Sequence, residues 1–355
     1  MTKEHLFSFD WELKNIESKH LGNVFSCFSC VGGSVLGYKL AGFNVVGCNE
    51  IDKNIISIYE QNINSEFNFC ESIRDFKKRT DLPKELYQLN ILDGSPPCSA
   101  FSLSGSREKS WGVEKVFHEG QQKQVIDTLF FDFIEVAKKL QPKVVIAENV
   151  KGILYGNAIK YCQKIYSGFD EAGYECQHFV LNSKFMGVPQ NRERIFFVCL
   201  RKDLAKQFPK KINIFSNFPY LNLNFDEKII TFGEIEDDKG DLVTSPVASW
   251  LYSKRKYGDE SLKQAAIREQ GKKKNFDAKY IYKHKTPPTL NTKGIEIIFD
   301  TGRKLSISER RKISTFPNDY NFCGKELFLT GMSVPPIMMA QISKRIYEQI
   351  LNKIQ

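Results

Sequence analysis

Residues 23–37 read "NVFSCFSCVGGSVLG" and join a short apolar run to a glycine-rich turn. The apolar run predicts a buried strand, because it is short and is bounded by glycines. The segment "YKLAGF" follows and predicts a helix that ends at Gly42. A strand, a turn and a helix in this order are typical of an open α/β sheet, whose ligands bind at the carboxyl ends of the strands.

The same alternation continues along the chain. Apolar runs at 44–50, 89–94 and 143–150 predict strands, and amphipathic stretches at 53–62 and 124–140 predict helices. Further on, "HFVLNS" and "RIFFVCL" bracket "KFMGVPQNRE" and predict a hairpin, and "PIMMAQISKRIYEQILNKI" predicts a C-terminal helix. Strands that alternate with helices predict a mostly parallel, doubly wound sheet, which is an α/β fold.

Composition limits the class of protein. A length of 355 residues corresponds to about two domains, and nine cysteines with no export signal are expected to be reduced thiols. The sequence contains no apolar run long enough to span a bilayer, and its first residues carry charges where a signal peptide needs an apolar run. The protein is therefore expected to stay in the cytoplasm, without membrane contact.

The region 201–300 is polar and lysine-rich, with basic residues among aromatics in "SKRKYG", "EQGKKKNF" and "KYIYKHK". Such runs are commonly a solvated surface. A net charge of +9 also allows a nucleic-acid partner without establishing one. Both interpretations stay open on composition alone.

The first candidate site is the glycine turn. It lacks the G-x-G-x-x-G pattern of a pyrophosphate cradle, because Cys30 stands where a first glycine would be. Glu50 follows Gly33 by seventeen residues at the end of the next predicted strand, a spacing that suits a carboxylate on ribose hydroxyls. S-adenosylmethionine has a ribose and no pyrophosphate, so it fits both observations. The alternative is a turn that only reverses the chain.

The second candidate site is "GSPPCSAFS" at 94–102. Two adjacent prolines exclude a helix interior and a central strand, so the segment is expected to be a rigid turn past a strand end. Such a turn would aim Cys98 into the ligand crevice, where its thiolate could act as a nucleophile. The alternative is a buried structural cysteine.

Two further segments are expected to add polar groups at the carboxyl ends of the predicted strands, beside the ligand crevice. "AENV" places Glu148 at the end of a predicted strand, and "VPQNRERIFF" offers Gln190, Arg192 and Arg194. The two arginines would alternate onto one face of an extended chain. A helix cap and surface ion pairs are the alternatives, but a cysteine, a carboxylate and a guanidinium at one edge favour a catalytic site.

These motifs, in this order, resemble the C5-cytosine DNA methyltransferases over nearly the whole chain. The matching blocks are "FSCVGGSVLGYKLAGF", "NEID", "GSPPCSAFS", "ENV", "QNRERIFFV", "RKLSISERRKISTFPNDYNF" and "GMSVPP". The resemblance implies a doubly wound, Rossmann-like S-adenosylmethionine-dependent methyltransferase sheet plus a small irregular target-recognition domain. Residues 1–199 and 324–355 would form the catalytic domain, and residues 200–323 the target-recognition domain.

The resemblance also implies a reaction on a cytosine that is flipped out of duplex DNA. Cys98 would attack C6 of the base, and C5 would then take the methyl group from S-adenosylmethionine. Glu148 would hold N3 and stabilise its protonated form. Arg194 would contact the cytosine carbonyl oxygen and orient Glu148, whereas Arg192 would hold a backbone phosphate.

The resemblance further assigns binding residues. Those implied for the cofactor are Phe28, Gly32, Gly33, Glu50, Ile51, Ile73, Pro97 and Ser333. Those implied for DNA are Ser102, Arg107, Lys109, Gln190 and Arg192. Residues 102–122 would form a lid over the DNA, and no metal ion is expected.

Two alternatives remain at this point. The tRNA-methylating branch of the family shares the catalytic blocks, although its Cys-Phe-Thr signature is absent between 201 and 302. A catalytically weak DNA-binding homologue is the other, because Cys30, Ser72 and Met332 depart from the family's usual glycine, aspartate and asparagine. The main expectation is a monomer that acts on double-stranded DNA, with any cognate restriction endonuclease acting separately.

Overall fold

A computed structural model describes residues 4–97, 114–115, 124–125, 128–156, 158–208, 221–271 and 278–354. The chain divides into two compact units. The larger, here called the sheet unit, comprises Ile16–Asn182, Glu193–Asn224 and Met339–Gln355. The smaller unit comprises Met1–Asn15, Ser183–Arg192 and Phe225–Met338. The predicted division by role, 1–199 with 324–355 against 200–323, stays a prediction.

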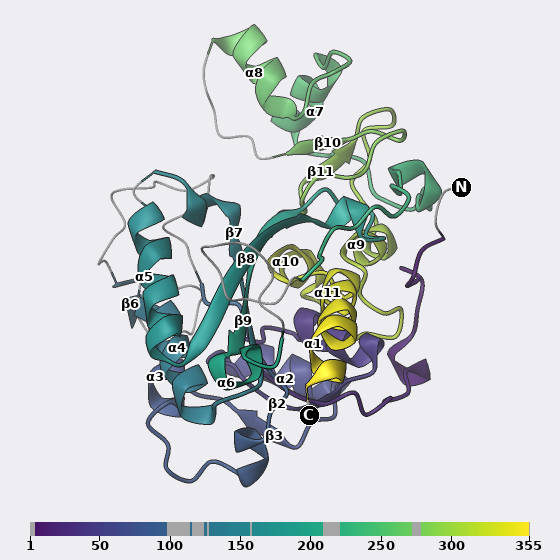
Figure 1. The fold of residues 1–355 in the computed structure, drawn as a ribbon. Helices are drawn as coiled ribbons and strands as arrows, with labels where there is room; N and C mark the ends of the chain where they lie inside the picture. Colours follow the sequence, from purple (N-terminus) through teal and green to yellow (C-terminus); the bar gives the residue numbers. More distant parts are fainter. Residues whose placement is uncertain are drawn as a thin grey trace. The chain divides into compact units, whose positions relative to one another are not determined.

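The sheet unit is built on one seven-stranded sheet (Figure 1). Its strands are β1 (Asn23–Cys27), β2 (Asn44–Asn49), β3 (Phe67–Phe69), β4 (Ile91–Gly94), β7 (Val144–Val150), β8 (Tyr174–Asn182) and β9 (Glu193–Arg201). Their order is β3-β2-β1-β4-β7-β9-β8. The first five are parallel, and β9 runs antiparallel to both of its neighbours. The mostly parallel sheet and the hairpin predicted from the sequence are confirmed.

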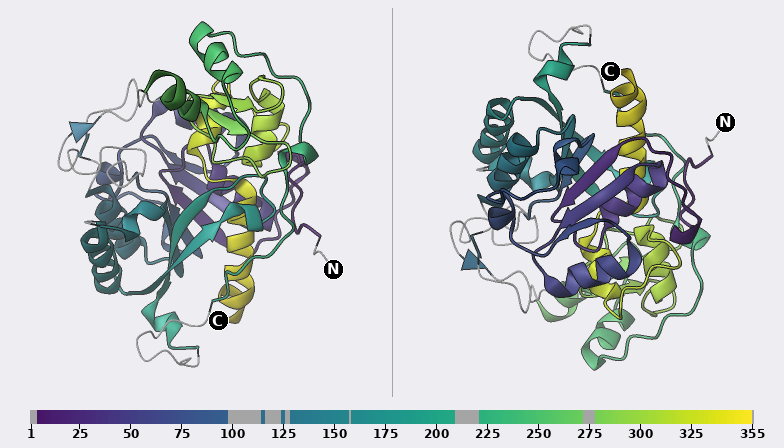
Figure 2. Two further views of the ribbon diagram at one scale, coloured as in Figure 1. Left: turned by 90° about the horizontal axis from the view of Figure 1, so that it is seen from above. Right: turned by 90° about the horizontal axis from the view of Figure 1, so that it is seen from below.

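Helices cover both faces of this sheet. They are α1 (Gly33–Ala41), α2 (Lys53–Asn62), α3 (Ile73–Phe76), α4 (Leu129–Leu140), α5 (Ala158–Glu171), α6 (Lys202–Ala205) and α11 (Pro336–Gln349), which the unit shares from Met339 onward. In the two views of Figure 2, α4 and α5 lie together on one face, and α1 and α11 lie on the other. Short pieces are η2 (Lys84–Tyr87), η4 (Lys151–Leu154), η7 (Leu351–Lys353), β5 (Glu114–Lys115) and β6 (Gln124–Val125).

The start of α1 differs from the sequence prediction. The helix begins at Gly33, so most of the glycine-rich "turn" is already helical, and Gly32, immediately before the helix, takes a left-handed conformation at φ 81°. A Cβ on Gly32 would lie 2.4 Å from the Ile63 side chain, so this position requires glycine. The end of the helix is as predicted, because Gly42 caps it at φ 105°.

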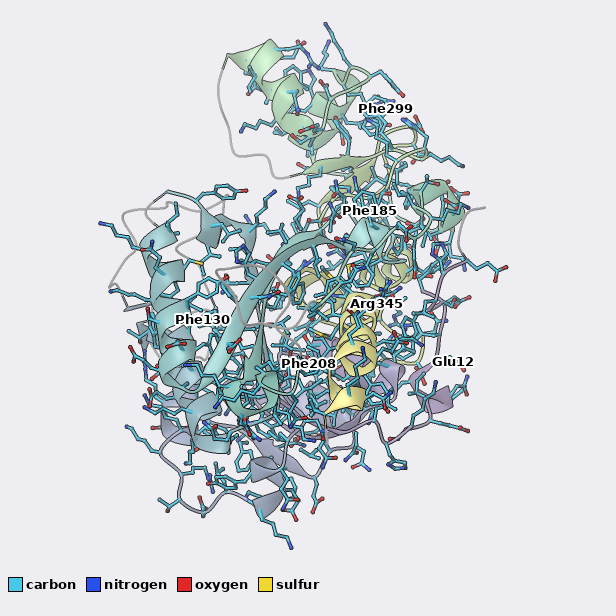
Figure 3. All side chains as sticks on the ribbon, in the orientation of Figure 1. Glu12, Phe130, Phe185, Phe208, Phe299 and Arg345 are labelled. Atoms are coloured by element: carbon cyan, nitrogen blue, oxygen red, sulfur yellow. The ribbon has the colours of Figure 1, made fainter. Side chains whose placement is uncertain are left out.

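Aromatic packing holds α4 and α5 onto the sheet. Phe130 of α4, labelled in Figure 3, meets Phe133, Tyr161, Phe169 and Phe197 edge to face. Such pairs stabilise a core beyond the area they bury. The helix starts at Leu129 rather than at the predicted residue 124. Its amphipathic stripe therefore covers the sheet only from that point.

The smaller unit has short elements and two small cores. Its elements are η1 (Leu13–Asn15), η5 (Ser183–Phe185), η6 (Phe232–Glu234), α7 (Pro246–Ser253), α8 (Leu262–Gln270), β10 (Lys279–Ile281), β11 (Glu296–Ile298), α9 (Ile307–Ser314) and α10 (Glu326–Met332). One core gathers around Phe299, labelled in Figure 3, and the other around Phe232. Across the described ranges of both units, no helix combines the length and the apolar character that a bilayer span needs.

Candidate active site

The carboxyl ends of four neighbouring strands carry the residues predicted to bind a cofactor. Phe28 follows β1, Glu50 follows β2, Ile73 follows β3 as the first residue of α3, and Pro97 follows β4. Because β3, β2, β1 and β4 are consecutive and parallel, these residues lie along one edge of the sheet. This is the edge at which open α/β sheets bind their ligands.

Glu50 is held in place by backbone groups. Its Oε2 accepts a hydrogen bond from the Cys30 N–H at 2.9 Å, and its Oε1 accepts one from the Asp52 N–H at 3.0 Å. The side chain is 8% exposed, and burial raises the pKa of Glu50. Each carboxylate oxygen has a second lone-pair site. The carboxylate therefore retains acceptor capacity for hydroxyl groups such as those of a ribose.

The chain before α1 is strained. Phe28 and Cys30 both lie in the left-handed region, at φ 54° and 49°, although neither is glycine. That conformation costs an L-residue about 1–2 kcal/mol. Cys30, which stands where a glycine was expected, adopts positive φ while its N–H donates a hydrogen bond to Glu50. The hydrogen bond to a buried carboxylate helps to offset the strain.

The remaining predicted cofactor residues of this edge are also placed. Gly32 and Gly33 form the junction with α1, and Ile51 is partly exposed beside Glu50. Ser72 caps α3, where its Oγ accepts a hydrogen bond from the Asp75 N–H at 3.1 Å. The departure at Ser72 therefore has a local structural role as a helix cap.

Glu148 and Arg194 form an ion pair. In the antiparallel register of β7 and β9, Val150 lies opposite Arg194, so Arg194 and Glu148 emerge on the same face. Arg194 Nε lies 2.9 Å from Glu148 Oε1, and the two side chains are 17% and 10% exposed. The predicted contact between these residues is present. At this low exposure, the guanidinium fixes the carboxylate more firmly than a surface pair would.

Asn149, the middle residue of the "ENV" block, connects the end of β7 to the turn after β4. Its Nδ2 donates to the Pro96 carbonyl at 3.2 Å, and its Oδ1 accepts from the Val150 N–H at 2.8 Å. The side chain is buried. It therefore ties the end of β7 to the proline turn that leads to Cys98. No local sequence signal identifies this contact, because the partners are 53 positions apart.

Gln190 and Arg192 belong to the smaller unit and are buried there. Gln190 Nε2 donates to the Ile313 carbonyl at 3.1 Å, and Arg192 Nη1 donates to the Gly331 carbonyl at 3.1 Å. Arg192 is 2% exposed. These positions favour a structural role for both side chains, and their predicted DNA contacts stay predictions. Ser333, predicted to bind cofactor, is also in this unit, where its Oγ donates to the Leu329 carbonyl at 2.8 Å.

Several predicted residues lie outside the described part of the chain. They are Cys98, Ser102, Arg107 and Lys109, together with the predicted lid at 102–122 apart from the backbone of β5. Their roles stay predictions. In the ranges that the structure does describe, no three His, Cys, Asp or Glu side chains are grouped so that they could hold a metal ion.

Comparison with known families agrees with this arrangement. The model of the C-5 cytosine-specific DNA methylase family matches residues 22–348. The chain belongs to this family. It is accordingly a DNA cytosine-5-methyltransferase.

Relatives of similar length carry matching names. The chain is 29% identical over 350 residues to the type II methyltransferase M.FnuDI of Fusobacterium nucleatum. This match covers 93% of the present chain and 95% of the relative. It is 28% identical to the type II methyltransferase M.NgoPII of Neisseria gonorrhoeae, over 91% and 94% of the two chains. This chain is therefore similar to type II methyltransferases over more than 90% of its length.

Solved structures support the fold. A protein described as a DNA modification methyltransferase encoded within an E. coli prophage matches with a TM-score of 0.66 at 20% identity, over 93% of this chain and 99% of that one. A mutant of the DNMT2 protein of Spodoptera frugiperda matches with a TM-score of 0.62 at 17% identity, over 92% and 99%. At these identities the matches show the Rossmann-like fold.

Proposed function

We propose that this methyltransferase transfers a methyl group from S-adenosylmethionine to C5 of a cytosine flipped out of a specific duplex DNA sequence, through a covalent bond from Cys98 to C6. The observation that carries the proposal is the Glu148–Arg194 pair on β7 and β9. Asn149, next to Glu148, binds the proline turn that leads to Cys98. The carboxyl group and the nucleophile turn are thereby held to the same sheet edge.

The chemistry assigns each side chain a step. The Cys98 thiolate would attack C6 as the C5–C6 π electrons move to C5. C5 would then bond to the methyl carbon of S-adenosylmethionine as the bond from that carbon to sulfur breaks, and S-adenosylhomocysteine would leave. Glu148 keeps a proton at N3, which draws electron density from C6 during the attack. Arg194 orients Glu148 and contacts the cytosine carbonyl oxygen. A base then removes the C5 proton, and those electrons re-form the double bond as the Cys98 sulfur leaves.

The described residues fit S-adenosylmethionine at the edge of β3, β2, β1 and β4. Phe28 is partly exposed and offers an apolar surface, Ile73 is buried at the start of α3, and Pro97 and the Gly32–Gly33 junction offer backbone groups. Glu50 would accept the ribose hydroxyls, and Ile51 would flank the adenine. The bound cofactor supplies an electrophilic methyl group on a sulfonium.

DNA is proposed to be held by a basic lid at 102–122, which includes Ser102, Arg107 and Lys109, and by a target-recognition domain at 200–323. Phosphate contacts would make the binding salt-dependent. The catalytic domain would be 1–199 with 324–355, acting as a monomer in the cytoplasm. A cognate restriction endonuclease would act separately.

Nucleoside mass spectrometry tests this function. The purified protein is incubated with S-adenosylmethionine and either unmethylated genomic DNA or unmodified tRNA, and both products are digested to nucleosides. We expect 5-methylcytosine in DNA, at one sequence context when the DNA is sequenced after bisulfite treatment. Methylation of tRNA alone would contradict the proposed substrate, and no product in either would contradict the proposed activity.

A further inference from the structure

Asp93 is a buried carboxyl group that the proposed reaction does not use. It lies on β4, is 1% exposed, and stands five residues before Cys98. Its Oδ2 accepts a hydrogen bond from Ser26 Oγ at 2.7 Å, and its Oδ1 accepts one from Tyr38 Oη at 3.2 Å. Among the described residues, no lysine or arginine forms an ion pair with it. A buried carboxyl group without a cation needs an explanation.

The register of the sheet places Asp93 beside Glu148. Asp93 lies opposite Ile146 in the parallel pairing of β4 and β7, and Glu148 follows Ile146 by two residues. Residues two apart on a strand point to the same face. The side chains of Asp93 and Glu148 therefore project from the same face of neighbouring strands.

The polar and titratable groups that face Asp93 come from three neighbouring elements, β1, α1 and β7. Ser26 comes from β1 and Tyr38 from α1, and both donate hydrogen bonds that favour a charged Asp93. The Cys27 thiol on β1 and the Glu148 carboxyl on β7 also interact with its charge. Burial raises the pKa of Asp93 to about 7, with the charge of Glu148 contributing in the same direction. Asp93 therefore changes its charge near neutral pH.

Glu148 stands between opposite charges. Arg194 Nε, 2.9 Å from Glu148 Oε1, brings a positive charge next to the carboxyl group. Arg194 alone would therefore oppose a proton shared between Glu148 and a bound base. A negative charge on Asp93 acts in the opposite direction, because two nearby carboxylates disfavour each other's ionisation.

We propose that Asp93 is a positioning residue for the reaction: its charge keeps a proton in the hydrogen bond between Glu148 and N3 of the target cytosine. This inference rests on the proposed function of Glu148. Asp93 touches neither substrate nor cofactor and acts only through Glu148. The alternative is a structural role, in which Asp93 merely joins β1, β4 and α1.

The pH dependence of methyl transfer separates these two roles. Single-turnover rates are measured from pH 5.5 to 10 for wild type and Asp93→Asn. Without the charge, the proton at N3 is lost more easily, so the alkaline limb is expected to move to lower pH by about half a unit or more. Asp170→Asn is the matched control, because it removes a mostly exposed carboxylate from α5 of the same unit and should leave the profile in place. A variant with lower stability but an unmoved alkaline limb would overturn the proposal.

An NMR titration without DNA or cofactor tests the same electrostatic coupling between Asp93 and Glu148. Protein labelled with ¹³C at the aspartate carboxyl carbons is titrated by NMR, and the Asp93 signal is identified by its loss in Asp93→Asn. Since coupling is reciprocal, Glu148→Gln should lower the Asp93 midpoint. An equal midpoint in both proteins would overturn the inference. This readout needs no turnover, so it remains decisive even where wild type forms no 5-methylcytosine and the proposed function fails.

Discussion

The buried Asp93 predicts an unusual dependence of stability on pH. Burial raises its pKa to about 7 in the folded protein, from an ordinary value of 3.8. The folded state thus binds this proton more tightly than the unfolded chain does. The associated stability is fully present below about pH 4 and is lost as pH rises through 7. Asp93→Asn removes the titrating group and should remove this loss.

The size of the effect follows from the two pKa values. One pKa unit corresponds to about 1.4 kcal/mol, and integrating both titrations between pH 5 and pH 8 gives a loss of about 2–3 kcal/mol. Urea unfolding followed by circular dichroism at pH 5 and pH 8 measures it for wild type and Asp93→Asn. We expect the variant's stability relative to wild type to increase by that amount at the higher pH.

Only the change with pH in the stability difference between wild type and Asp93→Asn tests whether the pKa of Asp93 is raised. The absolute difference at one pH also reflects the altered hydrogen bonds to Ser26 and Tyr38, because an asparagine has one acceptor oxygen where the carboxylate has two. The same difference between the two proteins at pH 5 and at pH 8 would show that Asp93 titrates near its ordinary value. That result would refute the reasoning.

Three further predictions concern other contacts. Glu148→Gln should slow methyl transfer by at least about 100-fold, as expected for loss of a general acid–base group. Its cofactor affinity, measured by calorimetry, should stay nearly unchanged. Equal losses of rate and of affinity would contradict the catalytic role of Glu148. Asn149→Ala should lower kcat by about 5- to 30-fold through loss of the bond to Pro96, corresponding to about 1–2 kcal/mol, and an unchanged kcat would contradict that role. Arg310→Met should lower the free energy of unfolding by about 3–5 kcal/mol, because it leaves the buried Glu296 without its cationic partner. Stability should be recovered only when Glu296 is also replaced by an apolar residue. Denaturant unfolding of the single and the double variant measures both effects.

The sheet could be predicted because its strands are short apolar runs with turn signals at both ends. Residues 143–150 and the pair at 178–183 and 194–200 became β7, β8 and β9 in the predicted arrangement. The predicted start of α1 was wrong because clustered glycines are typical of a turn, whereas in the structure the left-handed Gly32 is the N-cap and the helix begins directly at Gly33. Helix α8 was not predicted in the polar, lysine-rich region, although its capping box at Ser261 is a local signal.

In the candidate site, too, some contacts could be predicted from the sequence and others could not. The Glu148–Arg194 contact could be expected, because both residues sit in ordered motifs on neighbouring strands. The roles of Asn149 and Asp93 could not, because each depends on a partner brought close only by the sheet. The burial of Arg192 could not be predicted either. An arginine in a polar segment is normally expected at the surface, and nothing in the sequence indicates that it donates to carbonyl groups of α10.

Covalent trapping tests directly whether Cys98 is the nucleophile. Duplex DNA in which cytosine is replaced by 5-fluorocytosine is incubated with the protein and S-adenosylmethionine, because fluorine at C5 cannot leave as the proton does and the sulfur–C6 bond then persists. We expect a complex that survives denaturation, maps by peptide mass spectrometry to Cys98, and is absent in Cys98→Ser. An adduct on another residue, or no adduct from a protein that methylates ordinary DNA, would contradict the assignment of Cys98 as the nucleophile.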